Sequence, residues 1–465
     1  APGGSSIVIT VTGGSLAAAS AVTVTLYSIQ LGSPTAGGNI TVQTSADQLA
    51  SVAQASGVIG GQPLLSSFTI AASDRVAGKT SAAATFAFTP TAGGALGVNG
   101  VITLNYPTGF FVSGTNPISA AAQGVTFNAA TSGGSSIALT VATGAVAASS
   151  PITVTLTGFT MGAASAGGDV TVQTSVDVTV SGVRSSGVIG GQPSLSSFVV
   201  AASDRVAGKA SAAATFSFTT TAGGALATSS TITLTYPSGF FTTSAGTLGV
   251  LISGGVTGTM VAPTATQIVI TITDGTIALS TAVTVTVTGR TMGSATAGGS
   301  IFIATSADQT ASAGVNSGVI GGQVAACSFS MESLYRTAGL TGAAATFSFM
   351  TTAGGALAIG SKITLTYPSN FFTAVTSAGF IQPSGVTSSS ATPSPAQIVI
   401  TTALNSIAAS TAVTVTLTGL NLMNTPSPGG TMTILTSVDQ IPSAPFHSGV
   451  IGGIVDAVAF TISGA

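Results

Sequence analysis

Hydrophobic and polar residues alternate with a period of two over many short stretches of this chain. In residues 283–288, valines take one face and threonines take the other, which is typical of a half-buried β-strand. Similar alternating runs occupy residues 22–26, 102–106, 152–156, 232–236, 268–272 and 413–417. Clusters containing glycine and proline separate them, and no stretch keeps a helical period. The pattern therefore predicts an all-β fold.

The strand pattern belongs to a longer repeated unit. Val-Ile-Gly-Gly begins at Val58, Val188, Val319 and Val450. This spacing defines a tandem unit of about 130 residues, which is an ordinary size for a domain. A Tyr-Pro pair followed by two phenylalanines returns with the same spacing at Tyr106, Tyr236 and Tyr367. Each unit holds about seven or eight strand candidates, which favours an antiparallel β-sandwich of the Ig-like type.

The repeat divides the chain into parts with defined bounds. We expect complete β-sandwich repeats at residues 63–192, 193–323 and 324–453. Residues 1–62 align with 131–192 and are expected to be the C-terminal half of a repeat, while 454–465 correspond to the first strand of another. The sequence is therefore expected to be part of a longer polypeptide.

Composition narrows the possible functions. Only 4% of the residues are charged and the net charge is -2, which offers no basic surface for nucleic acid. Hydrophobic residues make up 45%, enough to build a core in each repeat. No run approaches the roughly 18 to 20 apolar residues of a membrane-spanning helix, so no membrane span is expected in this segment.

Residues that carry catalytic or metal chemistry are scarce. The chain has one cysteine, Cys327, and one histidine, His447, and neither has a counterpart in the other repeats. The recurring aspartates lack the density of a calcium loop, so we expect no metal, no cofactor and no enzymatic activity. The glycines of residues 91–94 are interpreted as turn residues that tolerate positive φ.

One set of opposite charges does recur. A Thr-Ser-x-Asp segment near the end of a unit is followed by an arginine at the start of the next unit: Asp47 and Arg75, Asp177 and Arg205, Asp308 and Arg336. We expect these residues to be inter-repeat contacts that pair across the junction and fix the angle between units. The alternative is that both are solvated loop charges, since an exposed pair contributes only about 0 to 1 kcal/mol.

Glycosylation is a second expectation. Asn39 begins an Asn-Ile-Thr sequon and is the candidate N-glycosylation site. Residues 387–395 and 424–428 are rich in serine, threonine and proline, which is typical of O-glycan carriers.

The repeated Ala/Gly/Ser/Thr-rich units with Ile-Gly-Gly boundaries resemble the secreted tandem β-sandwich proteins of unicellular algae and protists. In layout the chain is similar to the fibre-forming glycoproteins of cell coats and mastigonemes, and it also resembles bacterial Ig-like adhesin stalks. The resemblance implies an extracellular or cell-surface location and transfers no functional residue.

These observations predict an extracellular structural protein that forms a filament, stalk or surface coat, with self-association into a homopolymer or lateral assembly as its partner interaction. Short junctions between units predict limited bending. The alternative is an adhesin or carbohydrate-binding surface protein, which would show exposed aromatics such as Tyr106 and the phenylalanines near it. The apolar residues beside these aromatics favour core and edge packing instead, because aromatic side chains bury large areas.

Overall fold

The computed structural model describes residues 2–3, 5–121, 124–373, 378–382, 387–388 and 394–453. We call residues 63–192, 193–323 and 324–453 domains 1, 2 and 3, and residues 1–62 the N-terminal segment. The predicted strand of residues 454–465 lies outside the described residues. The described chain is almost entirely β-structure, as the alternating pattern predicted.

Among its described residues, the N-terminal segment has four two-residue strands: β1 (Pro2–Gly3), β2 (Ser6–Ile7), β3 (Asn39–Ile40) and β4 (Gln54–Ala55). Domain 1 contains β5 (Leu64–Ile70), β6 (Ala82–Thr89), β7 (Val101–Asn105), β8 (Ile118–Ala121), β9 (Thr126–Phe127), β10 (Ser136–Thr143), β11 (Ile152–Phe159), β12 (Asp169–Thr174) and β13 (Arg184–Ser185).

Domain 2 contains β14 (Ser194–Val200), β15 (Ala212–Thr219), β16 (Thr231–Thr235), β17 (Phe241–Ile252), β18 (Thr257–Met260), β19 (Gln267–Asp274), β20 (Ala282–Met292), β21 (Ser300–Thr305) and β22 (Val315–Asn316). Domain 3 contains β23 (Ala325–Ser330), β24 (Ala343–Met350), β25 (Lys362–Thr366), β26 (Ala378–Gln382), β27 (Thr387–Ser388), β28 (Gln397–Leu404), β29 (Ala412–Leu420), β30 (Thr431–Thr436) and β31 (Phe446–His447). Short 3-10 turns are η1 (Ala72–Asp74), η3 (Ala202–Asp204), η4 (Ser253–Gly255) and η5 (Ser333–Tyr335).

Each domain is a sandwich of two antiparallel sheets. Sheet I has the order β5-β6-β11-β8 in domain 1 and β14-β15-β20-β17 in domain 2. Sheet II has the order β13-β12-β7-β10-β9 in domain 1 and β18-β19-β16-β21-β22 in domain 2. In domain 3, β27 joins the equivalent sheets β23-β24-β29-β26 and β28-β25-β30-β31 into one continuous sheet.

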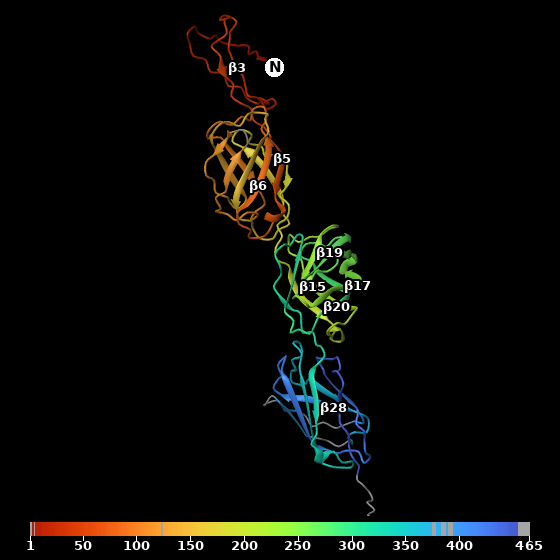
Figure 1. Cartoon of the computed structure of the whole chain (residues 1–465). Helices are drawn as coiled ribbons and strands as arrows, with labels where there is room; N and C mark the ends of the chain where they lie inside the picture. The colour runs from red at the N-terminus through yellow and green to blue at the C-terminus, as the bar shows by residue number, and fades with distance from the viewer. Residues whose placement is uncertain are drawn as a thin grey trace, which may run out of the picture.

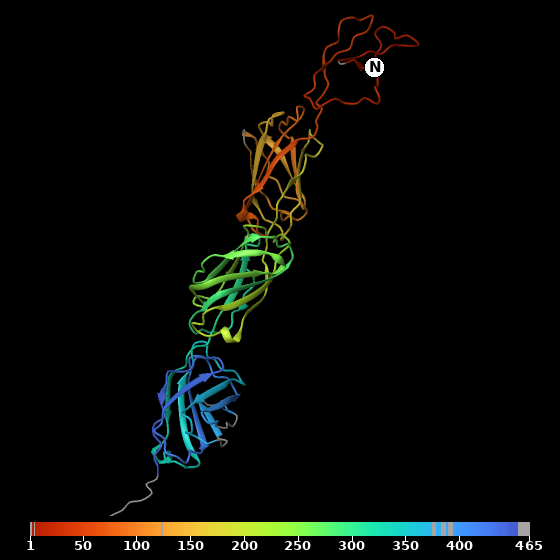
Figure 2. The same ribbon diagram turned by 90° about the vertical axis from the view of Figure 1, so that its right-hand side faces the viewer.

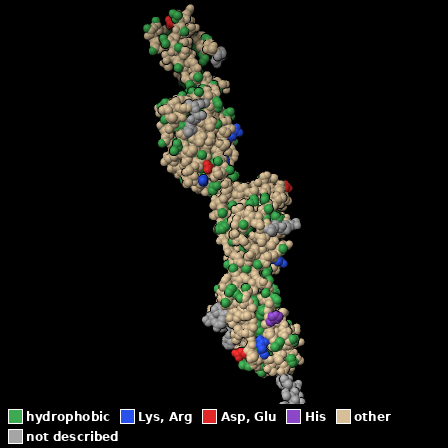
Figure 3. Space-filling view, in the orientation of Figure 1, with side chains coloured by type: hydrophobic (Ala, Val, Ile, Leu, Met, Phe, Trp, Pro, Cys, Tyr) green, Lys and Arg blue, Asp and Glu red, His purple; other side chains and the backbone are tan. Residues whose placement is uncertain are grey.

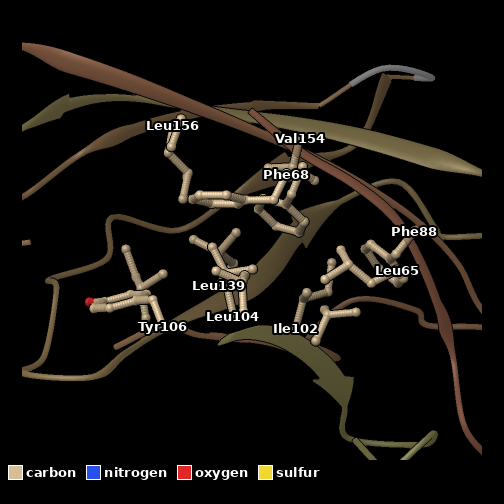
Figure 4. Packing of buried hydrophobic residues seen from close by; sticks show 14 of the residues in the cluster. Leu65, Phe68, Phe88, Ile102, Leu104, Tyr106, Leu139, Val154 and Leu156 are labelled. Atoms are coloured by element: carbon tan, nitrogen blue, oxygen red, sulfur yellow. The ribbon is translucent and has the colours of Figure 1, made fainter. Parts of the chain in front are cut away.

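The two-residue alternation places one face of each strand in the core. Strand β6 alternates buried and partly exposed residues along its whole length, and Phe86 and Phe88 are fully buried. Figure 4 shows Leu104, Leu139 and Leu156 of domain 1 facing the interior between the two sheets. Separate clusters of buried side chains occupy domains 1, 2 and 3, so each sandwich has its own core.

The Tyr-Pro and phenylalanine motif belongs to this core. Tyr106 is 4% exposed and Phe110 and Phe111 are 1% exposed. The Tyr106 hydroxyl donates hydrogen bonds to the carbonyls of Gly133 and Ser136 (3.0 and 2.9 Å). Burial raises the pKa of Tyr106 to about 12, because an apolar environment disfavours the phenolate. The motif therefore packs the interior of the sandwich.

The domains follow one another end to end as an elongated rod (Figures 1 and 2). Their tandem order places every junction on the axis of the rod. No helix among the described residues is long and apolar enough to cross a membrane.

Candidate functional site at the inter-domain junctions

The junction between domains 1 and 2 contains the second Val-Ile-Gly-Gly motif. We call residues 186–192 the first linker and the equivalent residues 317–323 the second linker. In the first linker, Gly190 and Gly191 are buried, although both lie at the boundary between two domains. Connecting segments usually run exposed over the surface. Each of these linkers is instead hydrogen-bonded to both neighbouring domains.

Domain 1 holds its side of the first linker by β-type pairing. The amide of Ala77 donates to the Gly190 carbonyl (2.8 Å), and the amide of Gly190 donates to the Arg75 carbonyl (3.0 Å). Ser165 and Ile189 exchange two further backbone hydrogen bonds (2.9 and 2.8 Å). The linker is thus paired in parallel with the segment at Val76 and antiparallel with the segment at Ser165.

Arg75 adds a side-chain anchor to this pairing. Its Nη1 donates to the carbonyl of Ser186 (2.6 Å) and that of Val188 (3.3 Å), while its Nε donates to the Ile70 carbonyl (3.3 Å). Partial burial lowers the pKa of Arg75 from its usual value, because removal from water disfavours the charged form. One guanidinium therefore joins the start of domain 1 to the segment that leaves it.

Domain 2 holds the other side of the first linker through Asp308. Its carboxylate is fully buried and accepts hydrogen bonds from the amide of Gly191 (2.8 Å) and the amide of Thr221 (2.9 Å). The Thr221 hydroxyl is a further donor to the same carboxylate. Because a buried carboxylate is costly unless its oxygens are satisfied, these donors fix the position of the linker against domain 2.

Two glutamines complete the junction. Gln192 in the linker donates through Nε2 to the Ala311 carbonyl of domain 2 (2.7 Å). Gln309, next to Asp308, donates to the Ala72 carbonyl of domain 1 (3.1 Å), which is a direct hydrogen bond between the two domains. The junction therefore has hydrogen bonds to the linker itself and one directly between the two domains.

The second linker repeats this arrangement. Arg205 of domain 2 donates to the carbonyls of Ser317 (2.6 Å) and Val319 (3.4 Å). Asp439 of domain 3 is fully buried and accepts from the amide of Gly322 (2.8 Å). Gln440 donates to the Ala202 carbonyl of domain 2 (3.3 Å). Both complete junctions are thus built from an arginine before the linker and an Asp-Gln pair after it.

The predicted pairing of each aspartate with the arginine at the start of the next unit is wrong. Asp177 accepts from Gly61 and Thr91 at the N-terminal end of domain 1. Its predicted partner, Arg205, lies at the C-terminal end of domain 2. The residues that share a linker are Arg75 with Asp308 and Arg205 with Asp439. Sequence proximity misled the prediction, because an antiparallel sandwich brings the start of each unit to the end of the same unit.

The predicted residues at the two ends have only part of this arrangement. Arg336 donates to the carbonyls of Ser448 (2.9 Å) and Val450 (3.2 Å), as the other arginines do in their domains. Asp47 lies in the N-terminal segment, is exposed, and bonds Thr44 within its own loop. Asn39 is exposed in β3.

The glycines at the junction are explained by close approach. Residues 92–93 form the predicted turn, which a hydrogen bond from the Gly94 amide to the Thr91 carbonyl (2.9 Å) closes. The expected positive φ is wrong, since Gly93 and Gly94 are absent from the left-handed residues. A Cβ at Gly94 would collide with the Asp177 carboxylate, and one at Gly190 would collide with the Ala307 carbonyl of domain 2. Glycine is required here because backbone and carboxylate come too close for any side chain.

Catalytic chemistry has little support at these junctions. Cys327 is half-buried, and burial raises the pKa of its thiol, with a Ser443 hydrogen bond acting in the opposite direction. Within the described part of the chain, no three His, Cys, Asp or Glu side chains gather into a metal-binding group. What the arrangement can do chemically is hold two domains in one relative orientation.

No family model and no curated protein matches the chain. Among solved structures, it is similar to the C-terminal domain of the antigen I/II-family protein AspA of Streptococcus pyogenes, at 8% identity and a TM-score of 0.26, covering 55% of this chain and 98% of that one. The collagen adhesin of S. aureus has 11% identity and a TM-score of 0.16, and the match covers 54% of this chain and 90% of that one. A serine-rich repeat adhesion glycoprotein of Streptococcus agalactiae has 12% identity and a TM-score of 0.17, and the match covers 55% of this chain and 96% of that one.

These three proteins are bacterial, so the expected resemblance to algal and protist coat proteins gains nothing from them and stays a prediction. The TM-scores are too low for an activity or a binding partner to be transferred to this chain.

Proposed function

We propose that this chain is a stiff structural rod of the cell exterior, in which tandem β-sandwich domains form the shaft of a filament, stalk or surface coat. The observation that carries the proposal is the double anchoring of each linker, by Arg75 and Asp308 at one junction and by Arg205 and Asp439 at the next. A linker that is buried and hydrogen-bonded to both neighbours resists bending, which is the property a shaft needs.

Charge-assisted hydrogen bonds make this anchoring stronger than ordinary loop contacts. A hydrogen bond to a charged group contributes about 1.5–3 kcal/mol, against about 1 kcal/mol for a neutral one. Each linker has such bonds to two charged groups, since its carbonyls accept from a guanidinium and its glycine amide donates to a carboxylate. Four of the 18 charged residues of the chain thus lie where they restrict domain motion.

The extracellular location and the glycans are part of the same proposal. Asn39 is exposed and is the proposed N-glycan carrier, and the exposed part of residues 424–428 is a proposed O-glycan region. Residues 389–393 of the other Ser/Thr/Pro-rich segment lie outside the described residues.

The carbohydrate-binding alternative requires exposed aromatic side chains, and the motif proposed for that role does not supply them. The aromatics that would form a sugar-binding platform, Tyr106, Phe110 and Phe111, are buried in domain 1, and their counterparts in domains 2 and 3 are buried too. An adhesin stalk, in contrast, would use the same rigid shaft.

The test is the spread of angles between domains in single particles imaged by electron microscopy. We expect a narrow spread at both junctions of the unmodified chain. A double variant, Arg205→Gln with Gln440→Ala, should broaden the angle between domains 2 and 3 at least about twofold, because it removes anchors on both sides of the second linker. The first linker of the same molecule is an internal control.

Lys209→Gln is the matched control for charge, since Lys209 lies in the same loop as Arg205 and its side chain is exposed. It should leave the angle unchanged. Equal spreads in the double variant and the unmodified chain would refute the proposal, as would flexible, bead-like particles of the unmodified chain.

A further inference from the structure

Among the described residues, the outer face of sheet I has no exposed charge in any of the three domains. Among the described residues of its strands, the single charged side chain is Arg290, which is fully buried. Sheet II differs, because its strands expose Asp169, Arg184, Asp274 and Lys362. In Figure 3 the charged groups are sparse across the visible surface. Ordinary soluble surfaces intersperse many charges, which prevent association.

The same face has hydroxyls in register on its two central strands. The Thr85 and Thr155 hydroxyls lie 3.0 Å apart in domain 1, those of Thr215 and Thr286 lie 2.9 Å apart in domain 2, and those of Thr346 and Thr416 lie 3.3 Å apart in domain 3. The strand registers place these pairs directly opposite each other. The face is thus repeated once per domain.

A surface of this kind is complementary to itself. Each hydroxyl is both a donor and an acceptor, so a threonine pair that has used one hydrogen bond internally can still bond a similar pair. The small side chains allow a second sheet to approach closely, and the lack of charge removes both repulsion and the cost of burying ions. A partner with a strong charge would gain nothing from this face.

We propose that the outer face of sheet I is the lateral interface of the rod and that its partner is the same face of a second copy of this chain. The inference rests on the proposed structural role and adds the surface through which rods associate. The face occurs once in each domain, so a weak contact per domain gives stable association wherever two or more domains engage the partner together.

The test compares two triple variants of the full chain. Thr155→Lys, Thr286→Lys and Thr416→Lys add one charge to each sheet I face. The control, Thr103→Lys, Thr233→Lys and Thr364→Lys, adds the same charge at partly buried positions on central strands of sheet II. Sedimentation over a concentration series measures association, and thermal unfolding checks that both variants fold.

We expect the unmodified chain and the sheet II variant to form side-by-side pairs or bundles, and the sheet I variant to associate at least about tenfold more weakly. Thr286→Lys alone changes one domain and should weaken association by a smaller factor, which keeps the test valid should the triple variant fold poorly. A chain that stays single at all concentrations, or equal effects of the two triple variants, would overturn the lateral interface.

Association that appears only with a neutral polysaccharide, tested with soluble β-glucan, would also overturn it. These outcomes are independent of the shaft proposal, since the spread of inter-domain angles is measured on single particles. A rod that is stiff but never pairs refutes the interface alone, whereas a flexible chain refutes the shaft.

Discussion

Residues 1–62 and 131–192 have closely similar sequences and different structures. In domain 1, residues 136–143, 152–159 and 169–174 form the long strands β10, β11 and β12. The aligned residues of the N-terminal segment form two-residue strands, and residues 22–26 form none. The prediction of a strand at 22–26 is therefore wrong for the described structure, although the same pattern is correct at 152–156.

The difference lies in the partner strands. In domain 1, β11 pairs with β6 and β8, and β12 pairs with β7, all from the first half of the unit. The N-terminal segment has no such half among the described residues, and Leu26 is 45% exposed where Leu156 is fully buried. Alternation and β-propensity are thus insufficient to form a long strand. A strand also needs a neighbour to bond its backbone and a second sheet to cover its apolar face.

The strongest way to break this comparison is to place a first half of the repeat before this segment. A chain with a copy of residues 63–130 placed before Ala1 should fold its N-terminal segment into a fourth sandwich. We expect that domain to be stable by about 5–15 kcal/mol, as single domains are. Hydrogen–deuterium exchange should then show slow exchange at residues 7–11, 22–26 and 39–42.

The control for this experiment is the same added half with the residues equivalent to Phe86 and Phe88 changed to serine. This variant should give the N-terminal segment no protection from hydrogen exchange, because two of the largest core side chains are lost. Exchange that stays fast with the intact added half would contradict the explanation by partner strands.

A matched pair of substitutions sharpens the comparison at one position. Leu156→Ala should destabilise domain 1 by about 2–5 kcal/mol, since it removes a fully buried side chain and leaves a cavity. Leu26→Ala, at the aligned position, should change stability by less than about 0.5 kcal/mol. Denaturant unfolding of the two variants measures both values, and equal losses would show that the N-terminal segment is packed after all.

The sequence predicted the sheets, the core alternation and the burial of the Tyr-Pro and phenylalanine motif, because each depends on residues close together in the chain. It did not predict the junction partners. Arg75 and Asp308 lie in different domains and far apart in the sequence, and their shared linker emerges only from how each sandwich returns to its own start. Gln309 and Gln440 were missed altogether. Their position directly after the recurring aspartates, at Asp308 and Asp439, was the available signal.

Domains 1 and 2 allow a third, smaller comparison within the core. Phe159 of domain 1 stacks on Phe111 with ring centroids 3.9 Å apart. The aligned residue of domain 2 is Arg290, which is fully buried over Phe241 with its guanidinium carbon 5.1 Å from the ring centroid. Its Nη2 donates to the Thr242 carbonyl (2.9 Å), while Nε and Nη1 have no hydrogen-bond partner among the described residues. Burial lowers the pKa of Arg290, and Tyr236 acts in the opposite direction.

Arg290→Phe should therefore stabilise domain 2 by about 1–4 kcal/mol, because it replaces a buried charge with unsatisfied donors by the apolar side chain that domain 1 uses. Hydrogen exchange of domain 2 amides under mild denaturant measures the gain. Lys209→Phe is the control, since it removes an exposed cation of the same domain and should give no stabilisation. A loss of stability in Arg290→Phe would mean that the guanidinium contributes more through Phe241 and Thr242 than its two unpartnered nitrogens cost.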